Sequence, residues 1–323
     1  MKISPALVLF FLAPAIAELL SGSAPPSEFF NPVGLLLLAS LYGSGALIVR
    51  EMKVRWKKGY VTMFVLGAAY GMIEEGLVVK SLFDPEWVDL GILGDYGRWL
   101  GVNWVWAEWL TIYHAIFSIA IPITLVELAF LERRNERWVG NRKLVGLVVL
   151  LGAVIVFGYF FLTDYRPPLP QYCFFAAIVA FIIILAWRIP SNSGGNGRLK
   201  VLMPRKLVLF GFLIALAFFL FFGAGPYVVS QPPILLFLGI GLVFVVFGFL
   251  RRYDWNEGTL YHKFTLVAGA VSFLIVLTPL QELDKSRTDN PQGMLIVGIS
   301  ALIMLILLRR KLRLPVGVLK RVR

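Results

Sequence analysis

The chain has 323 residues, of which 59% are hydrophobic and 15% are charged, and its mean hydropathy is +0.79. This composition excludes a soluble globular protein, because only a hydrocarbon layer of roughly 30 Å needs repeated apolar runs of about 20 residues. The net charge of +12 does not indicate a nucleic-acid partner, since the basic residues lie in short clusters between apolar runs. The single cysteine, Cys173, excludes an intrachain disulfide and a cysteine-rich metal site. The expected partner is the lipid bilayer.

The apolar runs predict an all-α, polytopic membrane bundle of about ten transmembrane helices. Each span is expected to be helical, because a segment surrounded by lipid has to satisfy its backbone hydrogen bonds internally. The expected spans are about 3–20, 31–49, 60–80, 104–131, 144–163, 172–188, 207–226, 233–250, 264–280 and 294–309. The first span also resembles a secretory signal, since Met1-Lys2 precedes a short apolar core and Ala15-Ile16-Ala17. Cleavage there would leave the later spans unchanged.

Basic residues are distributed unevenly between the two alternating sets of connecting segments. Of the 31 lysines and arginines, 26 lie in the set that includes both termini. The other set holds Lys80, Arg98, Arg166, Lys285 and Arg287. Cytoplasmic connections of membrane proteins carry an excess of lysine and arginine. The sequence therefore predicts a cell-membrane protein with both termini in the cytoplasm.

Ionisable residues inside the spans are concentrated in the first part of the chain. Residues 1–131 are expected to form an N-terminal membrane half that carries the polar cluster. Residues 132–323 are expected to form an apolar scaffold within the same membrane domain, because the spans from 172 onward are rich in Phe, Leu, Ile and Val.

Glu74 and Glu75 interrupt the apolar run from Val61 to Val79 and are the most informative pair in the chain. A single acid at the centre of a membrane helix costs roughly 2.5–3.5 kcal/mol on insertion scales, and two neighbours cost more because like charges repel. Such a pair indicates a functional site, the alternative being a buried pair that only specifies helix packing. Glu18 lies at the end of the first span beside these acids.

The third span carries other residues that bear on the two glutamates. Tyr70 precedes Glu74 by one helical turn and is expected to donate a hydrogen bond to it. Gly67 and Gly71 share that face and would let another helix approach closely. Lys80 does not share the face and is expected to snorkel outward from the bundle.

The fourth span contributes a polar stripe. His114 lies about ten residues into this span, Asn103 precedes it by three helical turns, and Ser118 follows one turn later. The three side chains are therefore expected to point the same way, towards a partner helix or cavity at the depth of the two glutamates.

Three features near the ends of the spans complete the expectations. Segment 81–103 is too polar and too rich in glycine to span, and is expected to form an interfacial or re-entrant helix over the site. Glu108 lies in the tryptophan-rich stretch 104–109, where the indoles are expected to form an aromatic belt. Arg50 and Glu51 are expected to be boundary charges, with a pair buried against the bundle as the alternative.

The motif Tyr70-Gly-Met-Ile-Glu74-Glu75-Gly, followed in the next span by His114-Ala-Ile-Phe-Ser118, resembles the Glu-Glu and His motifs of an intramembrane protease superfamily. This superfamily includes the CAAX-prenyl (Abi-type) and PrsW-like proteases. The resemblance implies that a glutamate activates water while histidine and asparagine stabilise the oxyanion. It assigns the role of base to Glu75 or Glu74, with His114 and Asn103 assisting.

Several functions remain compatible with the sequence. The first is an intramembrane glutamate-dependent hydrolase acting on a peptide or lipid-linked substrate. The second is a transporter in which Glu74, Glu75 and His114 relay protons or bind a cation, and the third is a non-catalytic scaffold or assembly subunit. Two glutamates and a histidine also suffice to hold a divalent metal, although nothing in their spacing requires a cofactor. The sequence does not indicate an oligomeric state.

Overall fold

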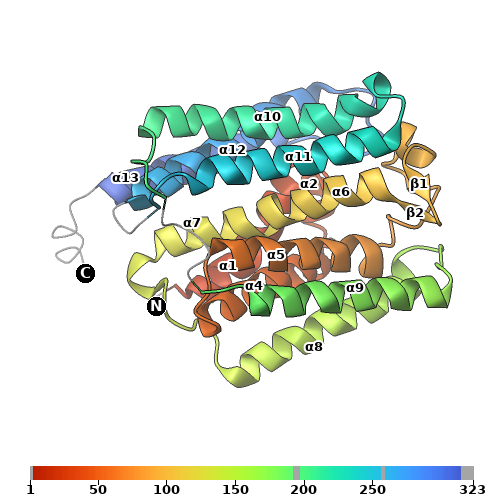
Figure 1. The fold of residues 1–323 in the computed structure, drawn as a ribbon, viewed down its shortest axis with the longest axis horizontal. Coiled ribbons are helices and arrows are strands. Elements are labelled where there is room, and N and C mark those ends of the chain that lie inside the picture. The colour runs from red at the N-terminus through yellow and green to blue at the C-terminus, as the bar shows by residue number, and fades with distance from the viewer. Residues whose placement is uncertain (1–2, 192–196, 256–258, 314–323) are drawn as a thin grey trace.

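The structure is a computed structural model that describes residues 3–191, 197–255 and 259–313. Within these residues the chain forms an α-helical bundle with one two-stranded hairpin (Figure 1). Eight of the described helices are long and apolar enough to cross a membrane, and the shorter apolar helix Pro5–Leu20 accompanies them. The predicted all-α polytopic fold is confirmed.

Each of the expected spans coincides with a helix, and the boundaries differ by a few residues. The eight long helices are Pro32–Arg55, Tyr60–Val78, Trp104–Ala129, Asn141–Leu162, Leu169–Arg188, Pro204–Val228, Pro232–Arg251 and Leu260–Leu283. The last helix, α13 (Met294–Arg313), ends in a basic run.

Several of these continuous helices are made of consecutive segments. The α-helical segments are α1 (Pro5–Pro14), α2 (Pro26–Phe29), α3 (Pro32–Leu38), α4 (Ser44–Arg55), α5 (Tyr60–Met72), α6 (Trp104–Tyr113), α7 (Ile121–Ala129), α8 (Asn141–Phe157), α9 (Leu169–Arg188), α10 (Pro204–Val228), α11 (Pro232–Arg251), α12 (Leu260–Leu283) and α13. Two short 3₁₀ turns, η4 (Gly91–Gly94) and η6 (Leu131–Arg133), lie in connections.

Five of the helices contain a π-helical segment, in which the turn is wider than in an α-helix. These segments are η1 (Ala15–Leu20), η2 (Ala39–Gly43), η3 (Ile73–Val78), η5 (His114–Ala120) and η7 (Gly158–Leu162). The position of η5 has a local cause, because Pro122 follows it and lacks the N–H that would bond the carbonyl of Ser118.

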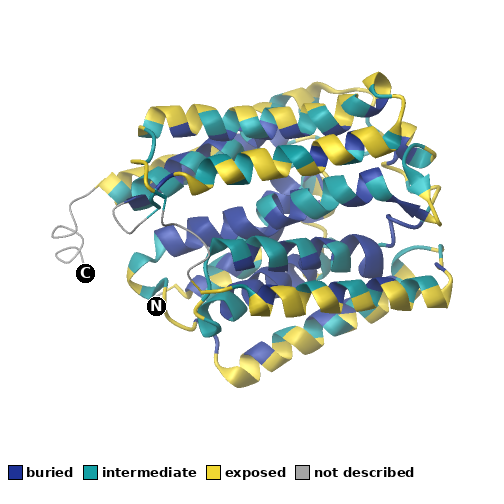
Figure 2. Cartoon of the chain, in the orientation of Figure 1, coloured by how far each residue is buried: buried dark blue, intermediate teal, exposed yellow. Residues whose placement is uncertain are grey.

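The bundle has an inner and an outer layer. Figure 2 shows α5, α6 and α7 with few exposed residues at the centre, and exposed residues concentrated on α8, α9, α10 and α11. The two described ends of the chain lie at one end of the bundle, and the β hairpin lies at the other (Figure 1). We call these the terminal end and the hairpin end.

Arg50 and Glu51 form a buried pair, which is the alternative that the sequence left open. Both side chains are fully buried, and Arg50 Nη1 donates to Glu51 Oε1 at 2.8 Å. The guanidinium also donates to the carbonyls of Glu136 and Arg134, each at 2.6 Å, and stacks 3.6 Å from the ring centre of Trp138. Arg50 therefore holds the connection between α7 and α8 against α4.

Segment 81–103 does not form the expected interfacial or re-entrant helix. It consists of turns, η4 and the antiparallel strands β1 (Arg98–Trp99) and β2 (Val102–Asn103). Gly97 and Gly101 adopt positive φ angles of 83° and 74°, which interrupt a helix. Arg98 satisfies three carbonyls of the segment that a helix would have paired internally. The segment nevertheless covers the core, because Leu82, Phe83, Leu90 and Leu93 are buried in it.

Candidate functional site

Four membrane helices meet at a polar cluster inside the bundle. Glu18 lies on η1, Tyr42 on η2, Glu74 and Glu75 on η3, and His114 and Ser118 on η5. All are buried except Glu18, which is half-buried. Each helix therefore presents its polar group from a π-helical segment, a feature frequent at functional sites. We call these six residues the Glu–His cluster.

His114 contacts both glutamates of the predicted pair. Its Nε2 lies 2.9 Å from Oε1 of Glu75, and its Nδ1 lies 2.8 Å from Oγ of Ser118. The same Nδ1 is 3.2 Å from Oε2 of Glu74. Both ring nitrogens are engaged, so the orientation of the imidazole is fixed from two helices.

Glycines bring η5 close enough to α5 for this contact. A Cβ atom at Gly71 would lie 2.9 Å from Cβ of His114, and one at Gly67 would lie 2.9 Å from Cα of Ala115. Real Cβ atoms need more room than this, so the two helices pack with their backbones in near contact. This agrees with the role expected for small residues on the third span.

Tyr42 is a member of the cluster that the sequence did not predict. Its hydroxyl lies within hydrogen-bond distance of one carboxyl oxygen of Glu18 and one of Glu74. The hydroxyl carries a single proton, so both contacts are hydrogen bonds only when one of the two carboxyls is protonated and donates to the phenol oxygen. The geometry thus favours a state in which Glu18 or Glu74 is protonated and the phenol bonds both carboxyls. A tyrosine inside an apolar span, rather than at an interface, was the available signal.

Ser81 and Trp106 support Glu75 and were also missed. The Ser81 hydroxyl donates to Oε2 of Glu75 and accepts a hydrogen bond of 3.1 Å from Nε1 of Trp106. Glu75 is therefore held at both oxygens. Its side chain keeps 12% exposure against 5% for Glu74, so Glu75 is the more accessible carboxyl of the pair.

Asn103 does not join the cluster, contrary to expectation. Its Oδ1 accepts a hydrogen bond of 2.9 Å from the N–H of Trp106, and its amide nitrogen donates to the carbonyl of Leu93. The helix begins at Trp104, so Asn103 is its N-cap with extended backbone, and the helical repeat from His114 does not reach it.

Tyr70 does not make the hydrogen bond expected for it. Its hydroxyl is buried and has no hydrogen-bond partner among the described residues. Its ring packs with its centre 6.0 Å from that of Tyr42 and 6.3 Å from that of His114. Tyr42, from a different helix, contacts Glu74 in its place.

Lys80 is buried inside the protein instead of snorkelling outward. Its side chain is fully buried, and Nζ donates to the carbonyls of Gly158 and Tyr159 at 3.0 and 3.1 Å. Its backbone adopts a positive φ of 65°. The carbonyls near the end of a neighbouring helix attract a cation, which removes the need to reach the membrane surface.

Three residues of the cluster also fit a divalent metal. Glu74, Glu75 and His114 each offer one ligand atom, and these atoms lie within 4.8 Å of one another. Oε2 of Glu74 is buried and faces Nδ1 of His114 at 3.2 Å, with no hydrogen bond from another described residue, so it can serve as a metal ligand. Carboxylate and imidazole donors suit manganese, iron and zinc.

Comparison with known proteins places the chain in a family. Residues 7–316 match an uncharacterized membrane protein family. An uncharacterized protein of Archaeoglobus fulgidus is 25% identical over 222 residues, which cover 67% of this chain and 67% of that protein. No solved structure matches the chain. The intramembrane protease superfamily is not among these matches, so that resemblance rests on the two motif-bearing helices alone. Since the match covers nearly the whole sequence, the chain belongs to this uncharacterized membrane protein family.

Proposed function

We propose that the protein is an intramembrane hydrolase in which Glu75 activates water for attack on a peptide or lipid-linked substrate. The observation that supports this most is the 2.9 Å contact between His114 Nε2 and Glu75 Oε1, made between two membrane helices. A carboxylate can remove a proton from water, and a neighbouring imidazole can hold that proton or pass it to the leaving group. The resemblance of the two motif helices to intramembrane proteases supports the same chemistry.

The other cluster residues have supporting roles in this proposal. Ser118 fixes the imidazole through Nδ1, and Ser81 orients the Glu75 carboxylate through Oε2. In this proposal Glu74 and Tyr42 share a proton, and they supply a proton reserve for Glu75 and His114. Asn103 is committed to capping α6, so stabilisation of an oxyanion falls to His114.

A label from water tests hydrolysis whatever the substrate is. Proteoliposomes containing the purified protein and a native membrane extract are incubated in ¹⁸O water, and new carboxyl or hydroxyl products are sought by mass spectrometry. We expect labelled products with the wild type, and at least a hundredfold less with Glu75→Gln or His114→Ala, because a positioned acid or base contributes about 10²–10⁴ in rate.

The matched control is Glu86→Gln, which removes an exposed carboxylate outside the cluster. It should retain the wild-type yield of labelled product. Thermal unfolding of each variant confirms that the cluster variants remain folded. Absence of labelled product with the wild type, or equal labelled product with Glu75→Gln, would contradict the hydrolase proposal and would favour a transporter or scaffold.

A divalent-metal centre at Glu74, Glu75 and His114 is the second candidate, favoured by the ligand atoms of the three residues lying within 4.8 Å of one another. A bound cation would lower the pKa of its water and serve hydrolysis, or would itself be the transported ion. Addition of Co²⁺ to the detergent-purified protein should produce a visible ligand-field spectrum that is lost in Glu74→Gln and His114→Ala. Glu86→Gln should keep the spectrum. No spectrum and no bound metal by elemental analysis would exclude this candidate.

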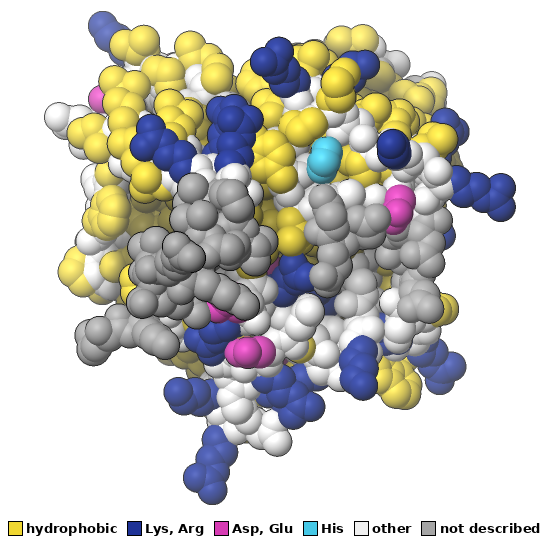
Figure 3. Space-filling view, turned by 90° about the vertical axis from the view of Figure 1, so that its left-hand side faces the viewer, with side chains coloured by type: hydrophobic (Ala, Val, Ile, Leu, Met, Phe, Trp, Pro, Cys, Tyr) yellow, Lys and Arg dark blue, Asp and Glu magenta, His cyan; other side chains and the backbone are white. Residues whose placement is uncertain are grey.

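We further propose that both termini face the cytoplasm of the cell in which the chain is made. The support is the positive bias of the sequence, and Figure 3 shows many Lys and Arg side chains on the terminal end of the bundle. Single cysteines introduced as Glu86→Cys and Arg142→Cys, in a background without Cys173, test this. A membrane-impermeant maleimide should label intact cells at position 86 and permeabilised cells alone at position 142. The reverse pattern would invert the topology.

A further inference from the structure

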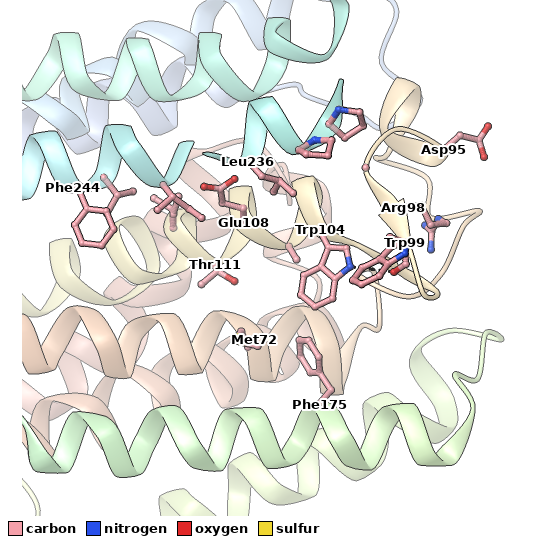
Figure 4. Close-up of a pocket in the computed structure, with 17 residues that line it drawn as sticks. Met72, Asp95, Arg98, Trp99, Trp104, Glu108, Thr111, Phe175, Leu236 and Phe244 are labelled. Atoms are coloured by element: carbon pink, nitrogen blue, oxygen red, sulfur yellow. Dashed lines mark hydrogen bonds between the residues drawn. The ribbon is translucent and has the colours of Figure 1, made fainter. Parts of the chain in front are cut away.

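An apolar groove lies between α6 and α11, near the hairpin end of the bundle (Figure 4). Its volume is about 970 Å³, and its walls come from α5, α6, α9, α11, β1 and the turn before β1. No residue of the cluster lines it. The volume falls in the range of about 300–1,000 Å³ that holds single small molecules.

Glu108 places an unpaired carboxyl in the wall of this groove. Both of its oxygens are buried and have no hydrogen-bond partner among the described residues. A Cβ atom at Gly239 of α11 would lie 2.5 Å from Oε1, so α11 leaves a hollow for the carboxyl without pairing it. A polar group buried without a partner costs free energy, which a ligand with a hydrogen-bond donor would recover.

The groove opens sideways towards the surrounding lipid along α11. Leu235 and Gly239 are the buried residues of this helix, so α11 packs against the bundle along a narrow strip. Ile240 and Phe244 line the groove and are 46% and 70% exposed. A lipid chain can therefore reach the groove from the bilayer without crossing the protein.

The end of the groove near the hairpin suits a cation. Trp104 lies one helical turn before Glu108 on the same face of α6, and Trp99 lies beside it (Figure 4). An ammonium group is attracted to indole faces as well as to a carboxylate. Arg98 also lines this end, but its guanidinium donates to the carbonyls of Phe83, Gly94 and Asp84. Arg98 therefore leaves both oxygens of Glu108 without a hydrogen bond.

We propose that this groove binds a long-chain amphiphile with an amine head group. The ammonium contacts Glu108 and the indoles, and the chain lies along Leu236, Ile240 and Phe244 of α11. An ionised fatty acid would bring no hydrogen-bond donor to Glu108, and a wholly apolar chain would leave the carboxyl unpaired. The proposal does not depend on the hydrolase function, because the two sites share no residue.

Photolabelling of the full protein in phosphatidylcholine liposomes tests the proposal. Hexadecylamine carrying a diazirine on its chain is activated by light, and the labelled peptides are identified by mass spectrometry. We expect label on α6 and α11. Glu108→Gln should reduce it about tenfold or more, since a hydrogen bond to a charged group contributes about 1.5–3 kcal/mol. Glu86→Gln, which changes an exposed acid outside the groove, should label like the wild type.

A steric pair of variants gives an independent measurement. Ile240→Trp fills the groove and should abolish labelling, whereas Val245→Trp changes an exposed residue of the same helix outside the groove lining and should have no effect. Hexadecanol and hexadecanoic acid with the same diazirine should label at least tenfold less than the amine. Equal labelling by the three probes, or labelling insensitive to both Glu108→Gln and Ile240→Trp, would overturn the proposal.

Discussion

The helices before residue 132 and those after it differ in how much of each helix is buried inside the bundle. Within the apolar windows of Tyr60–Val78 and Trp104–Ala129, 67% and 72% of the residues are buried. The corresponding shares are 17% for Asn141–Leu162 and 11% for Pro232–Arg251, although these two helices are the more hydrophobic. Hydrophobicity therefore marks the outside of this bundle, because the outside faces lipid.

Polar and small residues mark its inside. Between helices in lipid there is no hydrophobic driving force, so association depends on close packing and on hydrogen bonds. The central helices supply both, through Gly67 and Gly71 at the contact of α5 with η5 and through His114 beside Glu75. The outer helices contribute lipid-facing surface, and α9 and α11 supply part of the wall of the groove at Glu108.

Arginine substitutions should give the largest difference in unfolding free energy between the two regions. Arg50→Ala removes a fully buried guanidinium and leaves Glu51 and two carbonyls of the α7–α8 connection without it. Breaking a buried pair in this way costs about 3–5 kcal/mol of unfolding free energy. Unfolding in a denaturing detergent measures the loss. Arg142→Ala, at an exposed position on α8, should change stability by less than about 0.5 kcal/mol. Equal losses of unfolding free energy in the two variants would contradict the difference in packing between the two regions.

A pair of glycine substitutions tests the same comparison by packing. Gly67→Ala places a methyl group 2.9 Å from Cα of Ala115 and should destabilise the protein by about 1–3 kcal/mol. Gly152→Ala on α8 meets no atom within 4 Å and should be neutral or slightly stabilising. Thermal unfolding of the two variants in one detergent gives the difference. A stable Gly67→Ala protein would mean that α5 and η5 are not in backbone contact.

Lys80 connects the two regions, because it belongs to the first and donates hydrogen bonds to carbonyls of the second. Lys80→Met keeps the length of the side chain but deprives the carbonyls of Gly158 and Tyr159 of their donor. We expect a loss of about 1–3 kcal/mol, the usual cost of leaving buried polar groups unsatisfied. Proteolysis at the connection between α8 and α9 should rise in parallel. Lys285→Met, at an exposed position, is the control, and an equal effect there would refute the buried role.

The smallest effect is expected in the connection between α12 and α13, outside the membrane helices. Hydrogen bonding from Arg287 holds the pKa of Asp289 below its ordinary value. The carboxylate is thus favoured in the folded state, so its contribution is present above the unfolded pKa of about 3.9 and is lost as pH falls through the lower folded pKa. Asp289→Asn should cost less than about 1 kcal/mol near neutral pH. Unfolding curves should show this difference shrinking between about pH 5 and pH 2, and a growing difference would contradict the assignment.

The sequence alone determined the fold class and the helical spans, and it placed His114 at the depth of Glu74 and Glu75. It could do so because lipid imposes local rules on each segment, namely a minimum apolar length, internal hydrogen bonding and a high cost for each acid. These rules hold for each helix regardless of its neighbours in the bundle. The close helix packing at Gly67 and Gly71 could also be predicted, because the two glycines share one helical face.

The tertiary structure decided which side chains meet. Tyr42 reaches Glu74 from another helix, Asn103 caps α6 instead of facing His114, and Lys80 turns inward to the carbonyls of η7. These outcomes depend on where helices begin and end and on π-helical turns, which shift side chains from the regular repeat. The physical reason is that pairing partners lie far apart in the sequence, and no local pattern encodes the rotation that brings them together.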